Sequence, residues 1–255
     1  MIIKPNGNSG QGVDLTTKPQ IWFNGKWSGW YLEIYDGVPY WEALISESGT
    51  LTAAHGYTCD AWGIGGGGAG SEAYFSGYNY GFGGASGYTN MMEELTIPVG
   101  GTAVTIGAGG TTRSAAGGVT KFLALTCNGG NGAITVSSGS QYTNPATTPV
   151  ASGGSNGSNT GAGGSNGLPG AGKIMSKFWS EPHNTEYGAG GVKDDLDNAG
   201  GGGGYLPIGG TNATSGQGYG GGGGGAYQDG SGYLDKQMAD WRGKSGCLII
   251  RIKAA

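Results

Sequence analysis

Charged side chains are scarce in this sequence, and their scarcity excludes several kinds of partner. Only 12% of the 255 residues are charged, and the formal net charge at pH 7 is −4. The chain therefore lacks the basic surface of a nucleic-acid-binding protein, and we expect no nucleic-acid partner. No apolar run approaches the roughly 20 residues that cross a bilayer. Residues 1–7 also lack the apolar core of an export signal. We expect neither membrane insertion nor Sec-dependent export.

Reactive side chains are also few. The three cysteines, Cys59, Cys127 and Cys247, have no close spacing. This favours buried free thiols made in a reducing cytoplasm, with a disulfide between two of them as the alternative. His55 and His183 are the only histidines, and the Gly-x-Ser-x-Gly nucleophile motif is absent. We therefore expect no enzymatic activity and no cofactor.

Two short motifs resemble ligand-binding loops without matching them. Residues 63–68 have the G-x-G-x-x-G spacing of a dinucleotide-binding turn, but no amphipathic helix follows. Residues 195–200 resemble the start of a calcium loop, but Ala199 and Leu206 occupy two of its ligand positions. We therefore expect no metal. A looser cation site between Asp194 and Asp197 is an alternative to carboxylates that are simply solvated.

Glycine is the abundant residue, with 61 in the chain, and it forms uninterrupted runs at 65–68, 200–204 and 220–225. Ordering a residue costs about 1–2 kcal/mol of backbone entropy, and glycine has no side chain to bury in return. Each backbone hydrogen bond contributes only about 1 kcal/mol. Such runs are either linkers or closely packed extended segments that bond through their backbones and are clamped by strands. The 10% aromatic content and the low charge favour the ordered alternative.

A threefold glycine pattern supports this interpretation. Glycines recur every third residue at 161, 164, 167 and 170. An extended helix of the polyproline II type has three residues per turn, so these glycines would share one face. A face made of glycine lets a neighbouring segment approach closely.

Hairpin signals dominate the N-terminal part. Asn24 and Gly25 separate the apolar run 20–23 from Lys26 and Trp27, and an Asn-Gly pair is a strong signal for a two-residue turn. Asp36 and Gly37 similarly separate predicted strands at 30–35 and 38–45. Pro39 predicts that the second of these strands lies at a sheet edge. Further strands are predicted from β-branched content at 57–62, 95–99, 102–106, 121–126, 133–136 and 246–253, with a longer loop at 107–110.

These patterns predict an all-β fold. A glycine-rich, sandwich-like β domain with packed segments of the polyglycine II type is expected at 49–255. An N-terminal arm and a small aromatic β-hairpin unit for attachment are expected to precede it at 1–48. The hairpin unit holds four tryptophans: Trp22, Trp27, Trp30 and Trp41. Large side chains of this kind form the core of a small β unit or the interface with another subunit, and exposed rings also stack on sugars.

Three stretches in order carry a family resemblance. They are DAWGIGGGGAG at 60–70, VTIGAGG at 104–110 and GCLIIR at 246–251. Together they resemble the glycine-rich domain of phage and prophage tail proteins, over about residues 49–253. A looser similarity exists to the adhesins at the tips of T-even-like long tail fibres, in which polyglycine helices form a sandwich and loops contact the host receptor. The aromatic N-terminal unit and the closing strand depart from those adhesins.

The resemblance implies a structural protein of the phage virion, in the distal tail, made in the host bacterial cytoplasm. The expected partners are other tail, baseplate or fibre proteins, a host surface glycan or outer-surface protein, and further copies of the chain, most plausibly in a trimer. A carbohydrate-binding receptor adhesin proper and a tail-associated polysaccharide depolymerase are the alternatives. Tyrosines in glycine-flanked loops resemble antibody contact surfaces in composition, although such rings could instead cover the ends of glycine helices. The candidate receptor contacts are Tyr74, Tyr78, Tyr80, Tyr88 and Tyr227.

Overall fold

The strands of this protein form two large sheets and two hairpins. The computed structural model describes residues 18–27, 29–35, 37–75, 78–82, 84–132, 173–174, 186–187, 219–223 and 242–254. This part of the chain contains no helix, and hence none that could cross a membrane. The strands are β1 (Ile21–Phe23), β2 (Lys26–Trp27), β3 (Tyr31–Tyr35), β4 (Val38–Ile45), β5 (Gly49–Ala53), β6 (Tyr57–Ile64), β7 (Ser71–Phe75), β8 (Tyr78–Phe82), β9 (Thr89–Ile97), β10 (Gly100–Thr105), β11 (Thr120–Phe122), β12 (Leu125–Cys127), β13 (Lys173–Ile174), β14 (Glu186–Tyr187) and β15 (Cys247–Lys253).

The two large sheets pack as an antiparallel sandwich. One has the order β12-β11-β10-β5-β1-β2 and the other the order β3-β4-β15-β6-β9. Alternate residues face the space between them, as the period of a strand requires. Fully buried side chains from both sheets, including Leu51, Phe122 and Ile250, share one hydrophobic core. The predicted all-β sandwich is therefore confirmed.

Both predicted N-terminal hairpins form. Asn24 and Gly25 have φ angles of 50° and 70°, so both adopt the left-handed conformation that a tight hairpin turn needs. The Asn24 side-chain oxygen also accepts a hydrogen bond of 2.9 Å from the amide of Thr50, which ties this turn to β5. In the second hairpin Tyr35 lies opposite Val38, and Gly37 has a φ of 78°.

These hairpins belong to the sandwich. β1 pairs with β5, and β4 pairs with β15 along six residues. The strands before residue 48 therefore complete both sheets of the domain that follows.

The prediction that β4 lies at a sheet edge is wrong. β4 lies between β3 and β15. Pro39 is tolerated because it sits at the end of the ladder with β15, where Ala254 donates its amide to the Pro39 carbonyl just beyond the last residue of β15. The N–H that proline lacks would fall at this final position, so one bond is lost without interrupting the sheet.

The single strand predicted at 121–126 is a hairpin. β11 and β12 pair with Phe122 opposite Leu125, and the turn between them holds Leu123 at a φ of 49°. Leucine rarely adopts this conformation, so the sequence carries no turn signal here. Burying Phe122 and Leu125, both fully inaccessible to solvent, outweighs the local preference.

A bundle of glycine-rich segments extends from one end of the sandwich. Its central segment, residues 65–70, continues β6. Six outer segments surround it, and they comprise residues 84–88, 107–110, 114–118, 128–132, 220–223 and 243–246. The segments predicted to pack as polyglycine II are thus present. The stretch 107–110 is one of them rather than the longer loop expected from the sequence.

The hydrogen bonds of the central segment repeat every three residues. Its donors pair in order along the chain: Gly65 with Tyr88, Gly66 with Gly118, Gly67 with Lys244, Gly68 with Ala85 and Ala69 with Ala115. The first and fourth donors thus reach one neighbour, and the second and fifth reach another. The carbonyls of Gly66, Gly67 and Gly68 accept from the other three outer segments. Three residues per turn is the period of a polyproline II helix, so the three amides and three carbonyls of one turn reach six different neighbours.

The six outer segments also bond to one another and close a ring. In order around the centre they are 84–88, 128–132, 114–118, 107–110, 243–246 and 220–223, and each adjacent pair shares a backbone bond of 2.7–3.0 Å. As residue numbers increase along one segment, the residue numbers of its hydrogen-bond partners in the adjacent segment decrease, as for Gly84 with Gly223 and Gly87 with Gly220. Neighbours in the ring therefore run in opposite directions.

Strands of the sandwich clamp the bundle ends, as predicted. The central segment, 107–110 and 128–132 follow β6, β10 and β12, whereas 84–88, 114–118 and 243–246 lead into β9, β11 and β15. The buried Thr120 hydroxyl sits at this junction, where it accepts from the Gly107 amide and donates to the Ile64 carbonyl. Trp62 and Ile249 form a second buried cluster here, against which Tyr219 packs.

Glycine is required inside the bundle because neighbouring backbones occupy the space of a side chain. A Cβ added to Gly67 would lie closer than 3.0 Å to backbone atoms of Gly220 and Gly221. Every glycine of the run 65–68 meets this condition, and Gly220 meets it against the Gly65 carbonyl oxygen. The run 200–204, the glycines at 161–170, and the predicted strand at 133–136 lie outside the described residues.

We expect Gly67→Ala to destabilise the fold by about 3 kcal/mol or more, because neither the alanine nor the facing backbone can move away. Gly29→Ala is the matched control, since an added Cβ there meets nothing within 4 Å. Thermal unfolding of the two variants measures the difference. Equal melting temperatures for both would contradict the close packing of the bundle.

Candidate functional site

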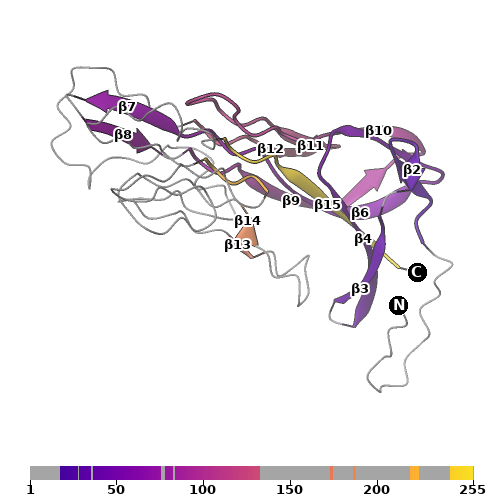
Figure 1. Ribbon diagram of the computed structural model, residues 1–255. Helices are drawn as coiled ribbons and strands as arrows, with labels where there is room; N and C mark the ends of the chain where they lie inside the picture. The colour runs from indigo at the N-terminus through magenta and orange to yellow at the C-terminus, as the bar shows by residue number, and fades with distance from the viewer. Residues whose placement is uncertain are drawn as a thin grey trace.

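Two described connections between bundle segments lie at the end away from the sandwich. Since the central segment leaves the sandwich and 84–88 returns to it, the residues between them turn at the far end. The same holds for 111–113. Figure 1 shows this arrangement, with β7 and β8 at one end of an elongated molecule and β3, β4 and β10 at the other. We call the end that carries β7 and β8 the distal end.

The structure brings three of the five candidate tyrosines into one distal hairpin. β7 and β8 pair antiparallel, with Tyr74 opposite Asn79 and Tyr78 opposite Phe75. Tyr80 lies opposite Ala73 in the same ladder. This hairpin extends from the central segment, so the most buried part of the bundle supports it.

The other two tyrosines are not placed with this hairpin. Tyr88 is half-buried, and its amide donates to the Asn128 carbonyl. It directly precedes β9 and its carbonyl accepts from Gly65, so it lies where the bundle meets the sandwich, at the opposite end from β7 and β8. Tyr88 thus fits the alternative that some rings cover segment ends. Tyr227 lies outside the described residues.

Two of the four candidate tryptophans are core residues. Trp30 and Trp41 are each 5% exposed and belong to the main hydrophobic core, and the Lys18 ammonium lies 5.8 Å from the Trp41 ring centroid. Trp22 is half-buried and lies opposite Trp27 in the first hairpin. The core interpretation of the tryptophans therefore holds for Trp30 and Trp41, and a contact with another subunit stays a prediction for the β1–β2 hairpin.

The glycine run 65–68 does not leave its amides available to a phosphate. Every N–H from Gly65 to Gly68 donates to a carbonyl of another segment. A phosphate-binding loop needs such amides directed at the ligand. The G-x-G-x-x-G spacing therefore arises here from packing.

All three cysteines are buried free thiols, which confirms the expectation from their spacing. Burial raises the pKa of the Cys59 and Cys127 thiols to about 12 and that of Cys247 well above its usual value. Since the thiolate is the reactive form, these groups are inert at neutral pH. In the described part of the chain no three His, Cys, Asp or Glu side chains gather in a potential metal site. Asp194, Asp195 and Asp197 lie outside it.

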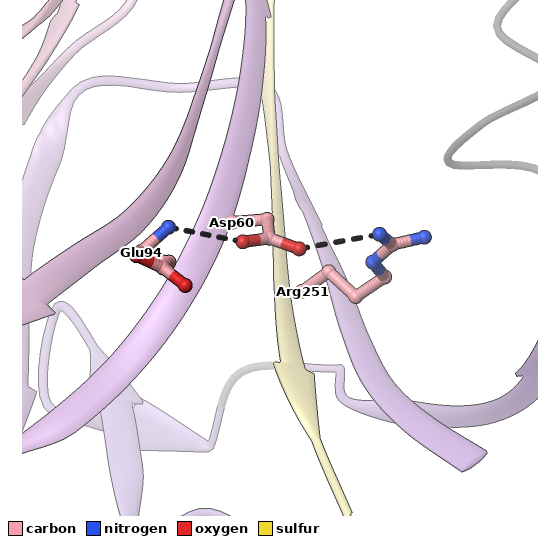
Figure 2. Close-up of polar contacts among 3 residues, drawn as sticks. All are labelled: Asp60, Glu94 and Arg251. Carbon is pink, nitrogen blue, oxygen red and sulfur yellow. Dashed lines mark hydrogen bonds and ion pairs between the residues drawn. The ribbon is translucent and has the colours of Figure 1, made fainter. Parts of the chain in front are cut away.

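A partly buried ion pair joins the adjacent strands β15 and β6 of the five-stranded sheet (Figure 2). The Arg251 guanidinium lies 3.2 Å from a carboxylate oxygen of Asp60, and the other Asp60 oxygen accepts a hydrogen bond of 3.1 Å from the Glu94 amide. Glu94 has a φ of 56° and lies in a bulge of β9. Asp60 thereby neutralises the arginine and fixes the bulge. The signal for this pair is an arginine within the apolar strand 247–252, but its partner is 191 residues away.

Glu42 is the second buried charge beside this arginine. It lies opposite Arg251 on β4 and is 3% exposed. Burial raises the pKa of Glu42 from 4.5 to about 7, Arg251 partly offsets this, and Glu33 adds to it. The arginine itself stacks on Tyr40, with its guanidinium carbon 4.3 Å from the ring centroid. This cluster lies in the sandwich, so it stabilises the fold and forms no part of the distal end.

We expect Glu42 to make the protein less stable as pH rises through about 7. The folded state holds the proton more tightly than the unfolded state, so the stabilisation is complete below pH 4.5 and is lost as the folded carboxyl ionises. The loss is up to about 3 kcal/mol. Glu42→Gln removes this dependence. Urea unfolding of both proteins at about pH 4 and about pH 8 compares them, and identical pH dependence in the two would show that Glu42 does not titrate in this range.

Comparison with known protein families gives a match over most of this chain. A family model described as a glycine-rich domain matches residues 45–253. No curated protein matches the chain. The match begins at the last residue of β4 and ends with β15, so it covers the bundle and most of the sandwich, whereas β1 to β3 precede it.

Proposed function

This chain belongs to the glycine-rich domain family, and on that premise we propose that it is a structural component of a phage virion, located at the distal tail in a fibre or tip. The observation that carries the proposal is the arrangement of the bundle. Of the seven backbone-bonded segments, six continue directly from or into strands of the sandwich, and the described connections, β7–β8 and 111–113, lie at the opposite end. The architecture suits a protein that is held at one end and makes contact at the other.

The fold of the bundle does not depend on the sequence of the residues that connect its segments. Its interior is held by backbone bonds, and the segments are fixed by strands of the sandwich. Residues 111–113, which connect two segments at the distal end, are exposed and contribute nothing to the core. Contact surfaces are commonly carried on loops positioned by a rigid scaffold.

Labelling of intact particles tests this proposal. We expect gold-labelled antibodies against the chain to bind purified virions of the encoding phage at the tip of the tail. Antibodies against the major head protein provide the control for specificity. Absence of the chain from purified particles, or labelling confined to the head, would contradict the proposal.

A direct role in receptor binding is the second candidate, and the β7–β8 hairpin favours it. Tyr74, Tyr78 and Tyr80 all lie in this single distal hairpin. Tyrosine combines a large apolar ring with a hydroxyl and has little conformational entropy to lose, so it is frequent at contact surfaces. We propose that this hairpin contacts a glycan or protein of the host surface.

Substitution of the three tyrosines by serine tests the second candidate. We expect the variant to assemble into particles but to adsorb to host cells at least about tenfold more slowly, since a central aromatic contact contributes about 2 kcal/mol or more. Thr111→Ala with Thr112→Ala, in a different distal connection, is the matched control. Unchanged adsorption of the tyrosine variant would limit the chain to a structural role.

A further inference from the structure

The five-stranded sheet has two edge strands, β9 and β3, and they differ in what lies beside them. β9 lies against β12 of the other sheet, and the Asn90 side-chain amide donates to the Thr126 carbonyl across this contact. Among the described strands, β3 pairs only with β4. Figure 1 shows the β3–β4 hairpin projecting from the sandwich at the end opposite β7 and β8. The outer side of β3 can therefore accept a further strand.

Pro39 shows which backbone groups of β3 face this outer side. The Pro39 carbonyl accepts from the Ala254 amide, so it points away from β3. In an antiparallel ladder the N–H and C=O of one residue point to the same side, and bonded pairs alternate with non-bonded pairs. Ile34 lies opposite Pro39 and therefore directs its N–H and C=O away from β4. The same holds for Leu32, two residues earlier, so each of these residues offers a donor and an acceptor to a neighbouring strand.

β3 lacks the features that usually protect a sheet edge. Lysine, proline and bulges commonly prevent the addition of a strand, but β3 contains neither lysine nor proline, and its ladder with β4 has no bulge. The Ile34 side chain is 58% exposed. By comparison, the edge strand β2 of the other sheet has only two residues, and one of them is Lys26. β3 thus combines outward backbone groups with an exposed apolar side chain.

We propose that β3 pairs with β3 of a second copy of this chain, antiparallel and with the two-fold axis at Ile34. A symmetric contact of this kind uses the same strand on both copies. An axis at Glu33 would place two carboxylates directly opposite each other, which is destabilising. An axis at Leu32 would place the exposed Ile34 opposite Trp30, which the core already buries. Only the axis at Ile34 brings the two exposed isoleucines together.

The length of β3 limits the strength of this contact. Stable interfaces bury about 1,200–2,000 Å², and a ladder of five residues is shorter than such an area requires. We therefore expect a reversible dimer with a dissociation constant of about 10–100 µM. The contact takes place at the sandwich end, so it leaves the distal ends of both copies open. It goes beyond the proposed tail role and does not depend on it.

Sedimentation of the full chain from about 1 µM to about 500 µM tests the proposal, and we expect monomers to be replaced by dimers across this range. Ile34→Pro removes an N–H that β4 does not use, and Ile34→Lys places two like charges at the axis. Each change is expected to weaken the dimer at least about tenfold. Val99→Lys is the matched control, since Val99 is 69% exposed but lies between β9 and β10. It is expected to change dimerisation by less than about twofold.

Cross-linking with a short bismaleimide tests the position of the axis. Opposite residues in a bonded antiparallel pair have Cα atoms about 5.5 Å apart, so we expect Ile34→Cys to give a covalent dimer. Val99→Cys is the control and is expected to remain largely uncross-linked. The three natural cysteines are buried and do not compete for the reagent. This measurement also decides the proposal if Ile34→Pro fails to fold, which its melting temperature would reveal.

Three outcomes would overturn the proposal. They are a monomer at every concentration, an equal loss of dimer in Ile34→Lys and Val99→Lys, and equal cross-linking of Ile34→Cys and Val99→Cys. Assembly into trimers in place of dimers would likewise exclude a two-fold contact. Particle labelling is independent of these measurements, so a chain found at the tail tip that stays monomeric in solution would refute the pairing of β3 without affecting the proposed structural role.

Discussion

The hydrogen bonds of the central glycine segment are the constraint on which this structure depends. An extended segment has no bonds within itself, and a buried amide or carbonyl without a partner costs about 1–3 kcal/mol. Residues 65–70 meet this requirement only because six other segments surround them. A Cβ at Gly65, Gly66, Gly67 or Gly68 would collide with the backbone of 128–132, 107–110 or 220–223, and a Cβ on one of the other three neighbours would collide with the central segment, as at Gly84, Gly87, Gly117 and Gly243. Glycine content, threefold period and the number of segments therefore follow from one requirement.

The sandwich provides what the bundle lacks. Glycine segments bury almost no apolar side chain, and their hydrogen bonds barely offset the entropy lost on ordering. The sandwich has a side-chain core that includes Leu51, Phe122 and Ile250, and its strands continue directly into the bundle. One carboxylate of the sandwich has two roles, since Asp60 both neutralises Arg251 and fixes the β9 bulge. The closing strand β15 joins the two parts, because it follows segment 243–246 and pairs with both β4 and β6.

Local signals predicted much of this fold. Asn24-Gly25 specified its hairpin, β-branched content indicated most of the later strands, and glycine runs next to strands indicated a clamped bundle. Features that depend on residues far apart in the sequence could not be predicted from local signals. Segments such as 114–118 and 128–132 contain alanine, serine or asparagine, so only the ring of backbone bonds reveals that they belong to the bundle. Pro39 led to the wrong prediction of an edge strand, because the N–H that proline lacks falls at the end of the ladder between β4 and β15. At the candidate site, sequence proximity grouped Tyr88 with Tyr74, Tyr78 and Tyr80, but a segment that spans the bundle separates them.

The alternating direction of the bundle segments has a mechanical consequence. The hydrogen bonds lie across the segments, while the sandwich and the distal connections lie at opposite ends of them. A pulling force between those ends therefore acts along every segment and perpendicular to the bonds that join them. In this geometry the bonds are loaded in shear and share the load, so they must yield together rather than open one after another. We therefore expect the bundle to resist extension along its length although it contains almost no side-chain core.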